Sequence, residues 1–160
     1  MSQSGYPFAM EARVANRTIV ETSVLVFDDA GLLLMLRRRG GRDRPDSYHL
    51  PGGPQITGET LAQAACRATV EATGVDIEIT GLVGIYSDPA DVVRRPGEGW
   101  CQELSVCFQG RPVGGDMGTD GTFHEPLWVE PERLDGLTVP KAERALVTHV
   151  LAERDRPYFT

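Results

Sequence analysis

A rigid turn followed by a helix with clear start and stop signals constrains this chain more than any other feature. Residues 51–54 read Pro-Gly-Gly-Pro, and a helix is expected over residues 60–73. Thr60 fits the N-cap position, and Gln63 completes a capping box three residues later. Gly74 stands where a left-handed residue commonly ends a helix. The segment therefore predicts a turn and a helix with well-defined ends.

The rest of the chain alternates between expected strands and helices. Two apolar segments, residues 18–27 and 32–36, flank the turn signal Asp-Asp-Ala-Gly at 28–31, which predicts a hairpin. Further strands are expected at residues 76–86, 102–108 and 127–129, a closing helix at 140–154, and a long polar loop at 110–124. The order of strands, helix, strands and helix favours an α/β or α+β sandwich with a mixed sheet.

The length of 160 residues fits one domain. Residues 1–17 show little periodic pattern and are expected to form an N-terminal extension, which leaves residues 18–160 as a single domain. No apolar run reaches the roughly 18 residues that a membrane span needs, and the N-terminus does not resemble a secretory signal. We therefore expect a cytoplasmic protein that does not enter a membrane.

Charge and cysteine content narrow the classes of partner. The formal net charge of −7 disfavours a general affinity for nucleic-acid polymers, which reward basic surfaces. It leaves room for a small phosphorylated ligand held by a few arginines. Cys101 and Cys107 are expected on one strand, roughly 20 Å apart, and are too distant for a disulfide. The three cysteines are therefore expected to be free thiols.

Residues 50–75 resemble the Nudix box, the motif of the Nudix hydrolase family. The box is a glycine, five residues, a glutamate, seven residues, and then Arg-Glu-apolar-any-Glu-Glu-any-Gly-apolar. Six residues match it in register: Gly53, Glu59, Arg67, Glu71, Gly74 and Val75. The preceding Leu-Pro-Gly and the later Leu-Trp-Val-Glu-Pro at 127–131 are also similar to the family. The resemblance covers residues 18–154 and implies a Nudix-like α/β/α sandwich.

The resemblance also implies a chemistry, and the sequence departs from it. Family members hydrolyse diphosphates with Mg²⁺, which binds carboxylates that share one face of the helix. Here Ala68 and Ala72 replace two of the three helical glutamates, so that only Glu71 remains as a metal ligand on the helix. Glu59 and Arg67 would support it. We therefore expect a crippled Mg²⁺ site.

Other side chains could compensate for the missing glutamates or hold the substrate. Glu103 and Asp120, and with less support Glu125, could supply a replacement carboxylate, or each could be a solvated surface acid. Candidate substrate-binding residues lie in the turn, in the basic loop after residue 36 and after the Pro-Gly-Glu-Gly at 96–99: Gly52, Gly53, Arg37, Arg39 and Trp100. His49, His124 and Cys66 are weaker candidates, since isolated histidines and cysteines are more often structural.

These observations are compatible with three alternative functions. The first is a Nudix-family protein that performs little or no ordinary diphosphate hydrolysis and uses its site to bind a small phosphorylated or nucleotide-like ligand, or for a metal-independent reaction in a small-molecule pathway. The second is an active hydrolase of a nucleoside diphosphate linked to another group, with Glu59, Glu103 and Asp120 as substitute carboxylates. The third is a non-catalytic interaction module. The resemblance leaves open whether the chain is an enzyme, and it offers a homodimer as one assembly by analogy.

Overall fold

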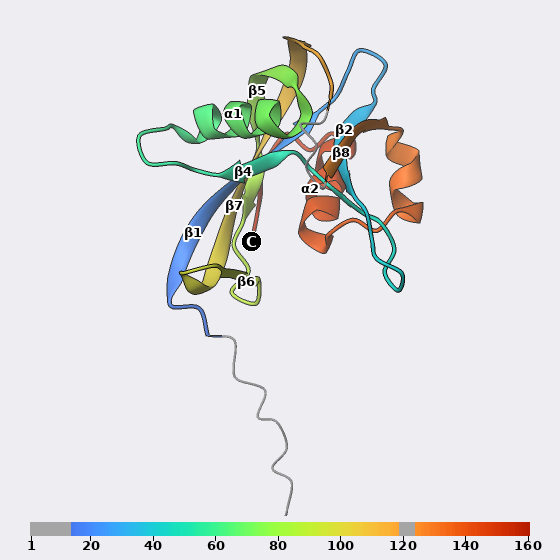
Figure 1. Ribbon diagram of the computed structural model, residues 1–160. Coiled ribbons are helices and arrows are strands. Elements are labelled where there is room, and N and C mark those ends of the chain that lie inside the picture. Colours follow the sequence, from blue (N-terminus) through green and yellow to red (C-terminus); the bar gives the residue numbers. More distant parts are fainter. Residues whose placement is uncertain (1–13, 119–123) are drawn as a thin grey trace, which may run out of the picture.

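Two β-sheets lie between two helices in the computed structural model, which describes residues 14–118 and 124–160 (Figure 1). The strands and helices follow in this order: β1 (Arg17–Val26), β2 (Leu33–Arg38), β3 (Ser47–His49), β4 (Gly52–Pro54), α1 (Leu61–Thr73), β5 (Val75–Tyr86), β6 (Val92–Arg95), β7 (Gly99–Gly115), β8 (His124–Val129), the 3-10 helix η1 (Pro131–Gly136), α2 (Lys141–Leu151) and β9 (Tyr158–Phe159).

The larger sheet is mixed and has the strand order β4-β1-β7-β5-β9, with β6 also paired to β7. β1 runs parallel to β7, with residues 17–26 opposite residues 101–110. β4 pairs with β1 and β5 with β7, both antiparallel. The smaller sheet, in the order β3-β2-β8, is antiparallel. The mixed sheet expected from the sequence is confirmed.

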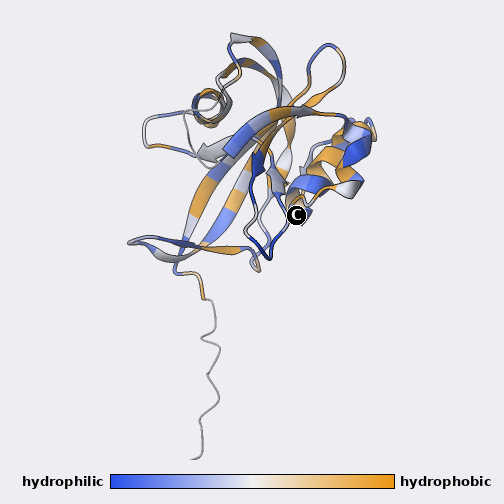
Figure 2. Ribbon diagram, turned by 45° about the vertical axis from the view of Figure 1, so that its right-hand side comes forward, coloured by the Kyte–Doolittle hydropathy of each residue, from blue (hydrophilic) through white to orange (hydrophobic). Residues whose placement is uncertain are grey.

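The side chains of β1 and β2 point alternately into two hydrophobic cores. Leu25 and Met35 pack with Leu146 and Val147 of α2. Val24, Val26 and Leu34 pack with Ala65 of α1 and with Val75 and Ile77 at the start of β5. Consecutive residues of β2 are therefore hydrophobic and buried, and Figure 2 shows hydrophobic bands along the strands. The helices thus lie on opposite sides of the sheets, which confirms the α/β/α sandwich.

The sequence signals for α1 are confirmed. The Thr60 side chain accepts from the Gln63 amide, and the Gln63 side chain accepts from the Thr60 amide, at 3.1 and 2.8 Å. Gly74 ends the helix with a φ of 75°. A Cβ atom there would lie 2.2 Å from the Asp116 carbonyl oxygen, so both the backbone angle and the space require glycine. These signals fix where the turn meets the helix.

The predicted hairpin of β1 and β2 is wrong. The turn at residues 28–31 forms as expected, with the Asp28 carboxylate accepting from the amides of Ala30 and Leu32. After it, one isolated bridge, Phe27 to Leu33, joins the two segments, and each strand then enters a different sheet. The reason is that β1 finds partners in β4 and β7, whereas β2 is buried on both faces and pairs with β3 and β8.

The expected long loop at 110–124 is partly wrong as well, because β7 continues to Gly115 opposite Val75. The short strands β3, β4, β6 and β9 were also not expected. The closing helix lies within its expected range. None of the helices in the described ranges is long and apolar enough to cross a membrane.

Candidate functional site

Residues 51–54, expected as a rigid turn, instead hold the extended strand β4, because their backbone pairs with β1. This segment, called the glycine turn, lies against β1 on one side and against α1 on the other. Gly52 and Gly53 of β4 face Ser23 and Thr22 of β1, and the Thr22 hydroxyl donates to the Gly53 carbonyl at 2.9 Å. A Cβ on Gly52 would lie 2.0 Å from the Thr22 carbonyl oxygen, and one on Gly53 would lie 3.1 Å from the Ala68 side chain. Small residues therefore allow the turn to pack closely between a strand and a helix.

Arg67 joins the turn, the loop after it and the helix. Its Nε and Nη2 donate to the two carboxylate oxygens of Glu59 at 2.6 and 3.1 Å. Nη2 also donates to the Pro54 carbonyl at 2.9 Å, and Nη1 donates to Glu71 at 3.0 Å. The sequence-predicted residues Glu59, Arg67 and Glu71 are therefore brought together in one network.

The charges in this network act mainly on Glu59. Hydrogen bonds from Arg67, followed by one from the Ile56 amide at 3.0 Å, hold the pKa of Glu59 below its usual value. The same contact with Glu59 raises the pKa of Arg67. Both oxygens of the Glu59 carboxylate already accept hydrogen bonds within the protein, so the group acts as a brace for the loop.

Ala68 and Ala72 leave α1 with a single carboxylate on this face. Ala68 is 5% exposed and packs against the turn, where its methyl group offers no ligand atom. The Glu71 side chain is 64% exposed and is directed to Arg67. In the described ranges, no three His, Cys, Asp or Glu side chains converge as ligands of one metal ion. Mg²⁺ needs several oxygen ligands in octahedral geometry, and these residues do not fit it.

Two of the substitute carboxylates, Glu103 and Glu125, have partners outside the Arg67 network. Glu103 shares the face of β7 that carries Cys107, which packs with the α2 core, whereas α1 packs on the opposite face. The Glu103 carboxylate accepts from Ser105 at 3.1 Å. Glu125 pairs with Arg37. Asp120, the remaining candidate, lies outside the described residues.

Three of the proposed substrate-binding residues lie on or beside other strands than β4. Arg37 is on β2, where its guanidinium faces Glu125 and Asp46. Arg39 is exposed in the loop after that strand. Trp100 is half-buried near the start of β7, opposite Arg94. Gly53 lies beside Thr22, whose partner on β7 is Val106, so Trp100 is six residues, roughly 20 Å, along the strand from the turn.

The structure adds a polar cluster that the sequence did not indicate, just before the turn. Glu143 of α2 accepts from the Leu50 amide at 2.7 Å and lies 3.6 Å from His49 Nδ1. The other ring nitrogen of His49 is 2.9 Å from the Ser47 hydroxyl. Burial, followed by the charges of His49 and Arg38, lowers the pKa of His124. His49, Ser47 and Glu143 thus form a polar cluster beside Leu50, which directly precedes the glycine turn.

A row of polar side chains continues on the α2 side of the larger sheet. Glu21 of β1 is 14% exposed at its side chain and forms an ion pair with Arg95 of β6. Glu21 pairs in register with Ser105, next to Glu103 on the same face. The alternation of residues along β1 could have indicated Glu21, but nothing in the sequence links Glu143 to His49 over 94 positions.

The cysteines carry no sign of activation. All three are free thiols, as expected. Burial raises the pKa of Cys66, and it raises that of Cys107 to about 12. A thiol reacts as the thiolate, so neither is suited to act as a nucleophile.

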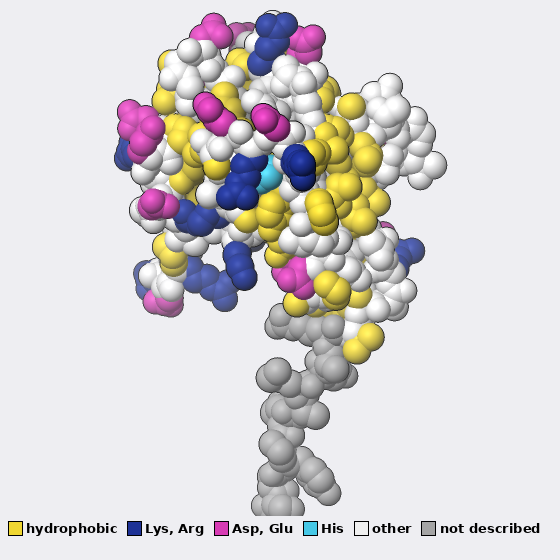
Figure 3. Space-filling model, turned by 180° about the vertical axis from the view of Figure 1, so that it is seen from behind, with side chains coloured by type: hydrophobic (Ala, Val, Ile, Leu, Met, Phe, Trp, Pro, Cys, Tyr) yellow, Lys and Arg dark blue, Asp and Glu magenta, His cyan; other side chains and the backbone are white. Residues whose placement is uncertain are grey.

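Charges are mixed on the surface that Figure 3 shows, where acidic and basic side chains lie interspersed among apolar ones. The expectation that nucleic-acid polymers are not ligands, drawn from the net charge of −7, stays a prediction.

Comparisons with known proteins agree on one family. The model of the NUDIX domain matches residues 17–150. The chain is 31% identical over 124 residues to a putative 8-oxo-dGTP diphosphatase of Bacillus subtilis, an alignment that covers 77% of this chain and 74% of that protein. It is 29% identical over 136 residues to the low-salt glycan biosynthesis protein Agl8 of Haloferax volcanii, covering 85% of each.

Solved structures show the same fold. A MutT protein from Methanosarcina mazei Go1 superimposes with a TM-score of 0.65 at 24% identity, covering 88% of this chain and 97% of that one. A mutator MutT protein from Bacillus halodurans gives a TM-score of 0.69 at 21% identity, covering 88% and 86%.

Proposed function

Since the chain belongs to the NUDIX domain family, we propose that it retains the family's ligand site but performs little or no metal-dependent diphosphate hydrolysis. It binds a small phosphorylated, nucleotide-like ligand beside the turn at Gly52 and Gly53. Any reaction there is metal-independent and belongs to a small-molecule pathway.

One observation carries this proposal: the carboxylates that would hold Mg²⁺ are missing where the family needs them. Ala68 and Ala72 occupy two of the three helical positions, and Glu71 is engaged with Arg67. Metal ions in such sites neutralise phosphate oxygens and activate water, and their loss removes the largest electrostatic contribution to the reaction.

The neighbouring side chains support a remaining use of the site. Arg67 and Glu59 hold the turn and the loop after it without a metal ion. His49, next to Ser47 and Glu143, offers acid–base chemistry that needs no metal. A nucleotide-like ligand is supported by the name of the Bacillus subtilis relative, a putative 8-oxo-dGTP diphosphatase.

The test restores the missing carboxylates. Phosphate release from a panel of nucleoside diphosphate derivatives, with Mg²⁺ or Mn²⁺, is compared between the natural protein and the Ala68→Glu/Ala72→Glu double variant. The matched control is Ala68→Gln/Ala72→Gln, which adds the same bulk without charge. Circular dichroism shows whether both variants fold, since Ala68 packs against the turn.

We expect turnover only in the glutamate variant, with an increase of about 100-fold or more, the range seen when a single electrostatic group of an active site is removed. Binding of the same panel to the natural protein, by calorimetry without metal, is expected at micromolar strength. Efficient Mg²⁺-dependent turnover by the natural protein would refute the proposal.

A second candidate is an active hydrolase that uses substitute carboxylates. The name of the 31% identical relative favours it, and Asp120 lies outside the described residues. Under this alternative, Glu71→Gln abolishes a turnover that the natural protein already has. Under the main proposal, Glu71→Gln changes only ligand binding or stability.

A further inference from the structure

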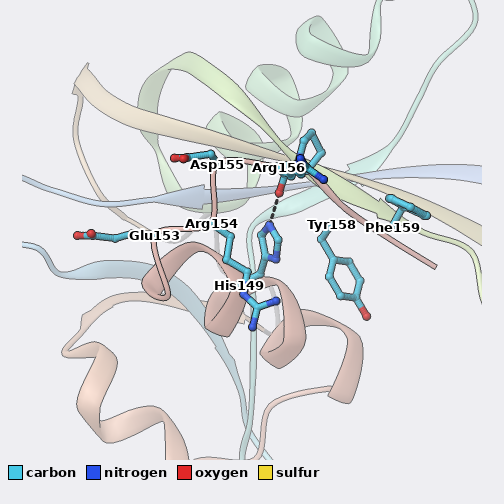
Figure 4. A pocket seen from close by; sticks show the side chains of 8 residues that line it. His149, Glu153, Arg154, Asp155, Arg156, Tyr158 and Phe159 are labelled. Atoms are coloured by element: carbon cyan, nitrogen blue, oxygen red, sulfur yellow. Dashed lines mark hydrogen bonds between the residues drawn. The ribbon is translucent and has the colours of Figure 1, made fainter.

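The C-terminal end of α2 and the chain that follows it form an open hollow on the protein surface. Its volume is about 590 Å³, and it is lined by His149 and by residues 153–159 (Figure 4). α2 ends at Leu151, and the chain reverses at Glu153, a non-glycine residue with a positive φ of 49°. It then returns to the larger sheet as β9, parallel to β5.

Contacts within the segment hold the hollow open in a defined shape. His149 Nε2 lies 2.6 Å from the Arg156 carbonyl oxygen. A carbonyl can only accept, so Nε2 carries the hydrogen in this bond. The His149 ring meets Tyr158 edge-on, with centroids 5.6 Å apart and an interplanar angle of 69°. The Ser87 hydroxyl donates to the Thr160 carbonyl at 3.0 Å, which anchors the end of β9.

The charged residues of this segment alternate in sign, and all four, Glu153, Arg154, Asp155 and Arg156, line the hollow. Glu153 and Asp155 project away from His149 and Tyr158 (Figure 4). Arg154 and Arg156 line the hollow, and within residues 14–118 and 124–160 neither guanidinium forms an ion pair. Because both carboxylates are directed away from the two rings, the unpaired guanidinium groups can bind an anion there.

Aromatic groups supply the second element of recognition. His149, Tyr158 and Phe159 all line the hollow, and Phe159 is 82% exposed. A planar ring can stack on such groups, and arginine favours phosphate because its planar donors match two phosphate oxygens.

We propose that this hollow is a second binding site, for a small phosphorylated molecule that carries a planar ring, such as a mononucleotide. Arg154 and Arg156 bind the phosphate, and His149 and Tyr158 contact the ring. The site lies on the α2 side of the larger sheet, whereas α1 and its Arg67 network pack on the other side, so the two sites are separate.

The experiment is a nuclear magnetic resonance titration of the full chain with ADP, GDP and UDP in turn, following backbone amides. We expect saturable shifts in residues 149–159 with at least one of them. Inorganic pyrophosphate lacks the ring and the matching nucleoside lacks the phosphates, so each is expected to bind at least tenfold more weakly.

Variants separate this site from general charge attraction. Arg154→Ala/Arg156→Ala should weaken the shifts in residues 149–159 at least tenfold. Arg133→Ala, an exposed arginine on η1, removes a similar charge elsewhere and should change nothing. An equal effect of the control would overturn the inference.

The titration also distinguishes this inference from the proposed function. Shifts confined to residues 50–72 would overturn the second site and support binding at the turn. Shifts confined to residues 149–159 would support the second site and count against the proposed function. The absence of shifts in both regions would overturn both.

Discussion

A single side chain, that of Arg67, connects the turn, the following loop and the helix through Pro54, Glu59 and Glu71. In the family motif this arginine precedes a glutamate, and here it precedes Ala68. The arginine of the motif is therefore present, although the glutamate that follows it in the motif is replaced by alanine. This is expected if its role is to hold the loop, since that role survives without a metal ion.

The pH dependence of stability should report the contact between Arg67 and Glu59. The pKa of Glu59 is lowered in the folded state, so the stabilisation is present above the unfolded-state value near 4.5 and is lost as pH falls through the folded-state value. Glu59→Gln should therefore lower the melting temperature at pH 7. Below about pH 4.5, the melting temperature of the variant should fall less steeply than that of the natural protein. Calorimetry from pH 7 to pH 3 measures both. Parallel profiles for the two proteins would show that Glu59 is not stabilised in this way.

The three thiols should differ in reactivity. At pH 8 a thiol with a pKa of about 12 is almost entirely protonated, and Cys101 and Cys107 are fully buried. We expect a thiol reagent to modify Cys66 first and slowly, and to reach Cys101 and Cys107 only after unfolding in denaturant. Mass spectrometry of digests identifies the order. Rapid modification of Cys107 in the folded protein would contradict the packing of β7 against α2.

At the scale of elements, the end of α1 is fixed by one glycine. Gly74→Ala forces an alanine to a φ of 75° and places its Cβ 2.2 Å from the Asp116 carbonyl oxygen. We expect the free energy of unfolding to fall by about 2 kcal/mol or more, and the melting temperature to fall by about 4–8 °C.

Gly58→Ala is the matched control for this substitution. Gly58 also has a positive φ, 97°, but no atom lies within 4 Å of the position a Cβ would take. The free energy of unfolding should fall only by the cost of the left-handed backbone conformation for alanine, about 1–2 kcal/mol. Equal effects of the two substitutions on thermal unfolding would show that the contact with Asp116 contributes nothing.

Capping and turn residues in the sequence correctly predicted the helix and the turn whose ends depend on contacts between neighbouring residues. The cap at Thr60, the glycine at position 74 and the Asp28 turn all formed as expected. Pairing between strands depends on partners distant in the sequence, and here prediction failed. β1 and β2 looked like a hairpin, but β7 is the partner of β1 over ten positions that begin 84 residues later. The two-residue strand β9 is too short to give a pattern.

The candidate site was predictable to a similar extent. Glu59, Arg67 and Glu71 fall within one motif of fixed spacing, and the structure joins them. Residue type alone suggested Arg37 and Trp100, but Arg37 pairs with Glu125 on the smaller sheet and Trp100 lies far along β7 from the turn. Glu143 came from the opposite end of the chain, since the packing of α2 alone brings it to Leu50 and His49. No spacing rule covers such a contact.

At the scale of the whole molecule, the sheets separate two environments. On the α1 side lie the helix and its Arg67 network, and on the α2 side lie the polar row from Glu21 to Glu103 and the C-terminal hollow. The glycine turn at β4 lies at the edge of the larger sheet, so it borders both sides. A ligand bound at this edge could therefore contact α1 together with side chains such as Ser23, which pairs with Gly52.

Stability of the whole chain should also reveal whether a metal ion binds, independently of any substrate. A ligand that binds only the folded state stabilises it by RT ln(1 + [L]/Kd). With a Kd of 10 mM or weaker, 10 mM MgCl₂ contributes about 0.4 kcal/mol at most, or about 1 °C in melting temperature. A site with a Kd near 0.1 mM would contribute about 2.7 kcal/mol and several degrees. Because α1 offers only Glu71, we expect the smaller value for the natural protein.

The Ala68→Glu/Ala72→Glu variant places three carboxylates on one face of α1 and should show the larger shift with MgCl₂, while the paired glutamine variant should not. NaCl at matched ionic strength corrects for screening of surface charges. A rise of several degrees in the natural protein would mean that carboxylates outside the described residues, Asp120 among them, complete a metal site with Glu71. That result would favour the active hydrolase over the binding protein. A rise seen only in the glutamate variant would show that the fold still accepts the metal and that the two alanines are what exclude it.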